Sequence, residues 1–150
     1  MAWWLVKTEP EVYSIDDLAR EGETDWTGVR NFQARNFLRE MAPGDGVLVY
    51  HSNAEPSGVA GIAAVSHIAA PDRTQFDKRS EFFDEKASKD NPRWFCPDIR
   101  FVRKLARLVS LDTLRGCKDL SGLLLLQKGS RLSVIPVSEK HFKKIVELGS

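Results

Sequence analysis

The order of the apolar patterns along the chain limits its fold more than any single motif does. A strand pattern occupies residues 3–7, and helical patterns follow at 14–22 and 31–41. Most of the remaining chain is strand-like. A doubly wound parallel sheet requires regular alternation of strands and helices, which this order lacks. We therefore predict an α+β fold, in which a small, mixed and curved sheet forms a barrel surrounded by helices.

The individual elements follow from periodicity and from residues typical of helix ends. Ser14 suits a helix N-cap, and Pro43 with Gly44 ends the helix that begins near Asn31. Four residues of that helix recur at i, i+3, i+4 and i+7 on one face: Ala34, Phe37, Leu38 and Met41. The other elements are expected as strands at 46–52, 58–68, 94–109 and 132–135, helices at 110–116 and 138–148, and a long functional or mobile loop at 69–93.

Length and composition are ordinary for a globular protein. The chain has 150 residues, of which 42% are hydrophobic and 29% charged, so we expect one domain spanning 1–150. No apolar run approaches the roughly 18–20 residues that a membrane helix needs. Cys96 and Cys117 lack a metal-ligand spacing and are expected to be reduced thiols. These features favour an intracellular protein, cytoplasmic by default and nuclear if eukaryotic, with no membrane partner.

Charge is unevenly distributed although the net charge is only +1. Residues 93–107 contain five basic side chains and one acidic side chain. Together with Arg30, Arg35 and Arg39, they would form a basic patch suited to phosphate groups. Scattered, solvated charges explain the same residues equally well, and the sequence leaves both interpretations open.

Support for catalysis is weak. The three histidines have no HExxH or CxxC companion, so no metal site and no cofactor are expected. A small hydrolase or transferase would require His51 to meet Ser52 or Cys96. Adjacent residues of a strand point to opposite faces, so the side chains of His51 and Ser52 would diverge. We therefore predict a non-enzymatic protein and keep this enzyme as an alternative.

Aromatic and amide side chains recur instead at the ends of the expected elements. Trp26 stands in a glycine-containing loop just before the helix at 31–41, where it would form either ordinary core or one wall of a pocket. A flat nucleobase is held by stacking on aromatic faces and by hydrogen bonds to its edge. This chemistry favours the pocket, with candidate base contacts at Lys7, Thr8, Trp26, Asn31, Tyr50, Ser52, Asn53 and Trp94.

Long, ordered stretches across nearly the whole chain resemble the EVE domain. They are "WWLVKTEPEVYSIDDL", "DWTGVRNFQARNFLREM", "GDGVLVYHSN", "PDRTQF", "PRWFCPDIRFVRKL" and "GSRLSVIPVS". The resemblance implies a PUA-like fold related to the YTH readers of methylated adenine in RNA. It also implies a non-enzymatic reader of modified bases, chiefly 5-methylcytosine and its hydroxymethyl form in DNA.

The resemblance also assigns roles by matching position. Trp26 and Trp94 would form two aromatic walls, with base-edge contacts from Lys7, Thr8, Asn31, Ser52 and Asn53. Phosphates would meet Arg131 and the arginines at and within the second helix, which are Arg30, Arg35 and Arg39. The family commonly has tyrosine where this chain has Phe32, and other residues where it has Cys96 and Pro97. Neither departure removes a proposed wall.

Energetics predict modest selectivity. Stacking contributes about 1–3 kcal/mol per aromatic contact, which roughly offsets the few kcal/mol that base extrusion costs. One extra buried methyl group adds only about 0.8 kcal/mol, or roughly fourfold in affinity. Phosphate contacts would then supply much of the affinity and make it salt-dependent. A reader of modified RNA and a module for free nucleosides remain alternatives, and a separate nuclease or effector protein is a possible partner.

Overall fold

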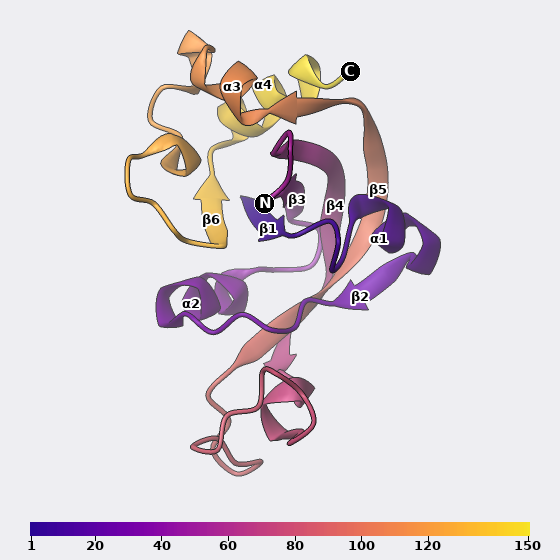
Figure 1. Ribbon diagram of the computed structural model, residues 1–150, viewed down its shortest axis with the longest axis vertical. Coiled ribbons are helices and arrows are strands. Elements are labelled where there is room, and N and C mark those ends of the chain that lie inside the picture. Colours follow the sequence, from indigo (N-terminus) through magenta and orange to yellow (C-terminus); the bar gives the residue numbers. More distant parts are fainter.

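A computed structural model describes residues 1–150, with one six-stranded sheet at its centre (Figure 1). The strands lie in the order β2-β5-β4-β3-β1-β6; only β1 and β3 pair in parallel, and every other pair is antiparallel. Their bounds are β1 Trp3–Thr8, β2 Glu23–Asp25, β3 Gly46–His51, β4 Gly58–Pro71, β5 Phe95–Ser110 and β6 Val134–Val137. The predicted α+β class and mixed, curved sheet are confirmed. The hydrogen-bonded order ends at β2 and β6, so the sheet is open and not a closed barrel.

The two long strands β4 and β5 bend across the molecule and give the sheet its curvature (Figure 1). Their register shifts at several points, which marks β-bulges. Gly61 lies beside one of the register shifts of β4, and an added Cβ there would stand 2.4 Å from Cγ1 of Ile15. Glycine at this position therefore allows helix α1 to lie directly against the sheet.

Four α-helices accompany the sheet, and each begins at a polar N-cap side chain. Their bounds are α1 Ile15–Glu21, α2 Phe32–Glu40, α3 Leu111–Arg115 and α4 Glu139–Leu148. Ser14 and Asp17 form a reciprocal capping box at α1, and Asn31 caps α2 by accepting a hydrogen bond from the N–H of Ala34. The predicted helix starts are confirmed. None of these helices is long and apolar enough to cross a membrane.

Two buried apolar clusters form the core. Along β1, Trp4 and Val6 belong to one cluster together with residues of α1 and α2, whereas Leu5 belongs to the other with residues of α3 and α4. This division follows from the alternation of side chains across a strand, as predicted for residues 3–7. Trp26 belongs to the first cluster, so the loop before α2 is anchored in the core.

The segment between β4 and β5 is organised around one buried glutamine. It contains the 3₁₀ helix η1, Arg73–Phe76. Two other short 3₁₀ helices, η2 (Lys118–Leu120) and η3 (Leu124–Leu126), lie outside this segment, between α3 and β6. The amide of Gln75, which is fully buried, donates to the carbonyls of Asp72 and Trp94 and accepts the N–H groups of Arg93 and Trp94. This network ties the start of the expected loop to its end.

Candidate functional site

A cavity of about 610 Å³ opens beside Trp26. This volume is within the usual range of ligand pockets, roughly 300–1,000 Å³. Its walls come from the end of β1, from α1 and the loop around β2, and from the segment after β4. The lining residues are Lys7, Thr8, Glu9, Val12, Tyr13, Glu21, Thr24, Asp25, Trp26, Thr27, Gly28, Val29, Arg30, Arg73, Glu81, Phe82 and Ser133.

Trp26 is both a core residue and a wall of this cavity. Its exposed fraction is only 7%, yet part of its surface borders the open space. The ring of Tyr13 stands edge-on to its indole, with ring centroids 6.1 Å apart and an interplanar angle of 86°. Burial of most of the indole holds it rigidly, which suits a wall against which a flat ligand stacks.

The loop after Trp26 is shaped by Gly28. Its φ of +91° is a left-handed conformation that favours glycine, and an added Cβ would lie 2.9 Å from the ring of Phe82. The N–H of Gly28 donates to Oδ2 of Asp72 at 2.9 Å. Glycine therefore lets Phe82 close over the loop and complete the far side of the cavity.

Arg30 lines the cavity, but its guanidinium is occupied by protein acceptors. Its N–H groups donate to the carbonyls of Phe82 and Val29, to the hydroxyl of Thr74 and to the buried carboxylate of Asp72, 3.0 Å away. A guanidinium has five N–H donors, and these contacts use all of them. Hydrogen bonds from Thr74, Gly28 and Arg30 outweigh burial and hold the pKa of Asp72 below its usual value. In this conformation Arg30 has no donor left for the predicted phosphate.

Trp94 lies outside the cavity, so the expected sandwich between two indoles is not formed. It is 5% exposed, and its ring stacks on Phe32 with centroids 4.9 Å apart and an interplanar angle of 19°. Its Nε1 donates to Oδ2 of Asp84 at 2.7 Å. Phe32 therefore occupies a face of Trp94 on which a base would stack. The positions of Phe32 and Trp94 in the sequence do not reveal this contact.

The other predicted base contacts are dispersed. Asn31 is exposed and caps α2. Asn53 is also exposed, with a φ of +51°, and donates from Nδ2 to Glu9 at 3.2 Å. Ser52 lines neither this cavity nor the second one described next. Among the predicted base-edge residues, only Lys7 and Thr8 border the cavity beside Trp26, and the hydroxyl of Thr8 donates to the carbonyl of Tyr13.

Tyr50 borders a second cavity of about 480 Å³ on the other side of Lys7. Lys7 and Tyr50 pair across β1 and β3, and the Nζ of Lys7 lies 6.0 Å from the centroid of the tyrosine ring. Lys7 lines both cavities. Burial lowers the pKa of Lys7 and raises the pKa of Tyr50.

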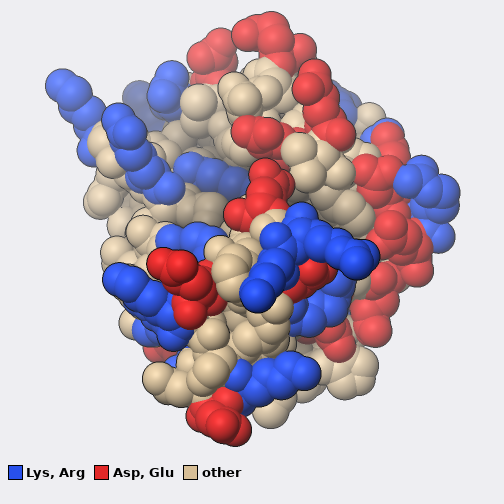
Figure 2. All heavy atoms as spheres, turned by 60° about the horizontal axis from the view of Figure 1, so that its bottom comes forward, with Lys and Arg blue, Asp and Glu red and all other residues tan.

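Three of the four predicted phosphate-binding arginines lie near one another, but protein groups already contact their guanidiniums. Arg30 and Arg35 lie 5.3 and 5.9 Å from the centroid of the Trp94 ring, and burial together with the charge of Arg39 lowers the pKa of Arg35. Arg35 donates to the carbonyl of Arg93 and to Asn36, while the guanidinium of Arg39 lies 4.3 Å from the centroid of the Phe95 ring. Arg131 is exposed in the loop before β6. On the face shown in Figure 2, basic side chains are interspersed with acidic ones and do not form a continuous basic surface. Four of the five basic side chains of residues 93–107 lie on β5 and are spread along its length.

His51 and Cys96, one of the two pairs considered for the alternative enzyme, do not converge. Nε2 of His51 accepts the N–H of Ile15 at the start of α1, and burial lowers the pKa of His51. Burial also raises the pKa of Cys96 to about 12, which keeps the thiol protonated. His51 pairs with Gly58 at the start of β4, whereas Cys96 pairs with Ala70 near its end. At about 3.3 Å per residue, the long strand separates them widely.

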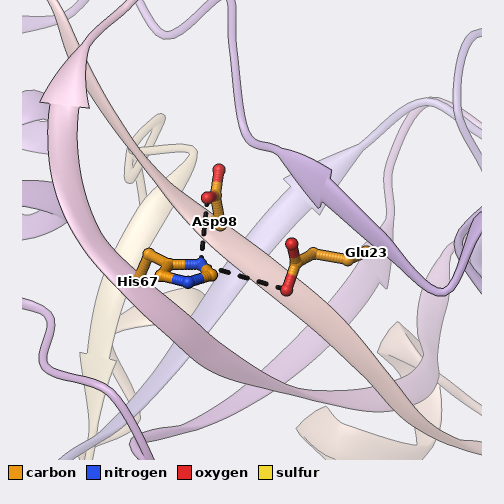
Figure 3. A group of neighbouring side chains, drawn as sticks. All are labelled: Glu23, His67 and Asp98. Atoms are coloured by element: carbon orange, nitrogen blue, oxygen red, sulfur yellow. Dashed lines mark ion pairs between the residues drawn. The ribbon is translucent and has the colours of Figure 1, made fainter.

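Three potential metal ligands meet on the outer surface of the sheet: Glu23 of β2, His67 of β4 and Asp98 of β5 (Figure 3). Nδ1 of His67 lies 3.1 Å from Asp98 and 4.0 Å from Glu23. Glu23 and His67 are exposed and Asp98 is partly exposed, and the pairing of His67 with Asp98 accounts for their approach without a metal.

Several cavity residues were not anticipated from the sequence. Tyr13 stands between β1 and α1. The only feature of the sequence that could have indicated its role is that it is an aromatic residue next to the helix cap Ser14. Arg73, Glu81 and Phe82 belong to the polar segment expected to be a loop, and nothing in their spacing places them opposite Trp26. Their position depends on contacts between segments more than 40 residues apart, such as the one from Gly28 to Asp72.

Comparison with known proteins identifies the family. The model of the EVE domain matches residues 2–148. The chain belongs to the EVE domain family. Human thymocyte nuclear protein 1 is 36% identical over 164 residues, which cover 97% of this chain and 72% of that protein.

Solved structures of EVE relatives agree with this fold. A Pseudomonas syringae protein is 44% identical with a TM-score of 0.96, over 99% of this chain and all of that one. Human THYN1 in complex with DNA that contains 5-methylcytosine is 36% identical with a TM-score of 0.94, over all of this chain and 98% of that one.

Proposed function

We propose that this protein is a non-enzymatic reader of modified DNA that takes one extruded base, 5-methylcytosine or its hydroxymethyl form, into the cavity beside Trp26. The observation that carries the proposal is the close likeness to human THYN1 solved with DNA that contains 5-methylcytosine. A cavity of about 610 Å³ with the aromatic rings of Tyr13, Trp26 and Phe82 in its wall supports it, since an extruded base is stabilised by such surfaces.

Within this cavity, Trp26 provides the rigid stacking face and Tyr13 packs edge-on against its ring. Lys7 and Thr8, at the end of β1, are positioned for polar contacts to the edge of the base. The hydroxyl oxygen of Thr8 retains acceptor capacity after donating to Tyr13. Trp94, Asn31, Ser52 and Asn53 support the surrounding structure in this proposal and do not contact the base.

A panel of otherwise identical DNA and RNA oligonucleotides that differ in one modified base tests the proposal. We expect DNA with 5-methylcytosine or 5-hydroxymethylcytosine to bind more tightly than unmodified DNA. The preference is modest, about fourfold for one buried methyl group. Stronger binding of the matched RNA would favour a modified-RNA reader, and equal binding of all oligonucleotides would refute a base reader.

Variants of Tyr13 test the cavity without removing the buried Trp26. Replacing Tyr13 with Ala removes an aromatic wall and should weaken binding of modified DNA about 5- to 150-fold, as stacking of about 1–3 kcal/mol implies. Tyr13→Phe is the matched control, because it keeps the ring and loses only the hydroxyl that donates to Glu21. Unchanged affinity in Tyr13→Ala, with the fold confirmed by circular dichroism, would place the base elsewhere.

A further inference from the structure

The second cavity differs from the first in its charge. It is lined by three basic side chains, Lys7, Arg115 and Lys128, and by no acidic one. The cavity beside Trp26 has four acidic side chains in its wall, and two of its three bases are paired, Arg30 with Asp72 and Arg73 with Asp25. An anion is therefore favoured in the second cavity and a neutral, flat group in the first.

The bases of the second cavity have no carboxylate partner. None of the three takes part in an ion pair within the protein. Lys7 is also half-buried, and desolvation of an unpaired ammonium group costs free energy that a bound anion would offset. Arg115 ends α3, and Lys128 lies in the turn after η3, so three separate elements direct cations to one space.

The remaining wall suits a phosphate group. Leu111, Leu125 and Leu126 provide an apolar surface that lowers the local dielectric constant and strengthens each charge interaction. The backbone N–H groups of Lys128 and Gly129 donate to no acceptor in the protein. Successive free N–H groups in a turn are a recurrent anion-binding arrangement.

We propose that this second cavity binds a backbone phosphate of the DNA strand whose modified base enters the cavity beside Trp26. Lys7 lines both cavities, so its side chain connects the base site to the phosphate site. This inference rests on the proposed function. It assigns the phosphate contact to Lys7, Arg115 and Lys128, and not to Arg30, whose donors are all occupied.

Arg115→Gln combined with Lys128→Gln tests this site. Both side chains are exposed, so the fold is expected to survive. The affinity for DNA with and without 5-methylcytosine is measured between about 50 and 200 mM salt. The slope of log affinity against log salt is negative, and each lost phosphate contact should reduce its magnitude by about 0.9 for a duplex. Both DNAs should lose affinity several-fold by the same factor, so that their ratio is unchanged.

The matched control is Lys140→Gln, which removes an exposed lysine of α4 that lines neither cavity. An unchanged slope in the double variant, or an equal change in the control, would overturn the phosphate site. Equal affinity of the wild type for DNA with and without 5-methylcytosine would instead refute the proposed function. The two outcomes are distinguishable, because the salt slope does not depend on that preference.

Inorganic phosphate distinguishes a site for the DNA backbone from one for a free anion. Titration into the wild type, followed by NMR, should shift the amide signals of Lys128 and Gly129, and the double variant should lose these shifts. Saturable phosphate binding without any change in the DNA salt slope would contradict a contact with the backbone.

Discussion

Trp26 and Trp94 show what single residues in this sequence reveal and what they conceal. Both are large apolar side chains near element ends, and both are buried. Of these two residues, only Trp26 lines the cavity of about 610 Å³, where Gly28 turns the chain beside it, whereas Phe32 stacks on a face of Trp94. Residue type and local pattern predicted that Trp26 borders a cavity, but they contained no information on the partner that covers Trp94.

Arg30 is a second residue whose role depends on a partner that the sequence does not reveal. Sequence placed it among arginines near a helix start and so among phosphate ligands, but the structure commits it to Asp72, whose side chain is 1% exposed. Arg30→Ala would leave a buried carboxylate without its partner. We expect the free energy of unfolding to fall by about 3 kcal/mol, at the lower end for such pairs because Arg30 is partly exposed. Urea denaturation measures this loss.

Arg39→Ala is the matched control for Arg30. Its guanidinium lies over the ring of Phe95 at the surface, so its removal should cost no more than about 1 kcal/mol. A stable Arg30→Ala protein with a reduced salt slope for DNA would show that Arg30 contacts phosphate and would contradict the structural role.

At the scale of elements, the sequence was most informative. Caps and periodicity placed the helices to within a few residues, because Ser14, Asn31, Ser110 and Ser138 all accept N–H groups of the following turn. The bounds of β4 and β5 also agree with the predicted strands to within three residues, but the shape of these strands was not predictable. Their bulges and their bend depend on pairing between strands, which a single strand pattern does not reveal.

The cap of α2 separates a structural role of Asn31 from the base contact expected from the family resemblance. Its Oδ1 accepts the N–H of Ala34 at 2.9 Å. Asn31→Ala should lower the free energy of unfolding by about 1 kcal/mol, while Asn31→Ser, which keeps a cap oxygen, should lose less. After correction for stability, DNA affinity should be unchanged in both. A selective loss of affinity for modified DNA in a fully folded Asn31→Ser protein would restore the base contact.

The start of α1 makes stability depend on pH through His51. The imidazole must be neutral to accept the N–H of Ile15, and burial lowers its pKa in the folded state. The unfolded chain therefore takes up a proton near pH 6.5, while the folded chain resists it. The stabilisation is present above this pH and is lost as the pH falls towards the folded-state pKa.

Urea denaturation at about pH 7.5 and about pH 5.5 measures this effect on either side of the histidine pKa. The wild type should lose more stability on acidification than His51→Gln, which has no imidazole to titrate. Carboxylates titrate equally in both proteins, so an identical pH dependence would refute the assignment to His51.

For the whole molecule, the order of patterns predicted the α+β class, but the cavity is a property of long-range packing. The segment that follows β4 returns to the loop beside Trp26 through Asp72, Phe82 and Gly28. The arrangement of charges was not predictable from the sequence for the same reason. Basic residues that are close in sequence are spread along β5, while Lys7, Arg115 and Lys128 come from distant positions to line one cavity.

The most direct test of the central claim is an NMR measurement of the base pair itself. In a DNA duplex with one 5-methylcytosine, the imino proton of the opposite guanine reports whether the pair is intact. At saturation with the protein, we expect this signal to disappear and the amides of Thr27 and Gly28 to shift. Persistence of the imino signal at full binding, with the cavity amides unmoved, would show that the base stays in the helix and would contradict the account.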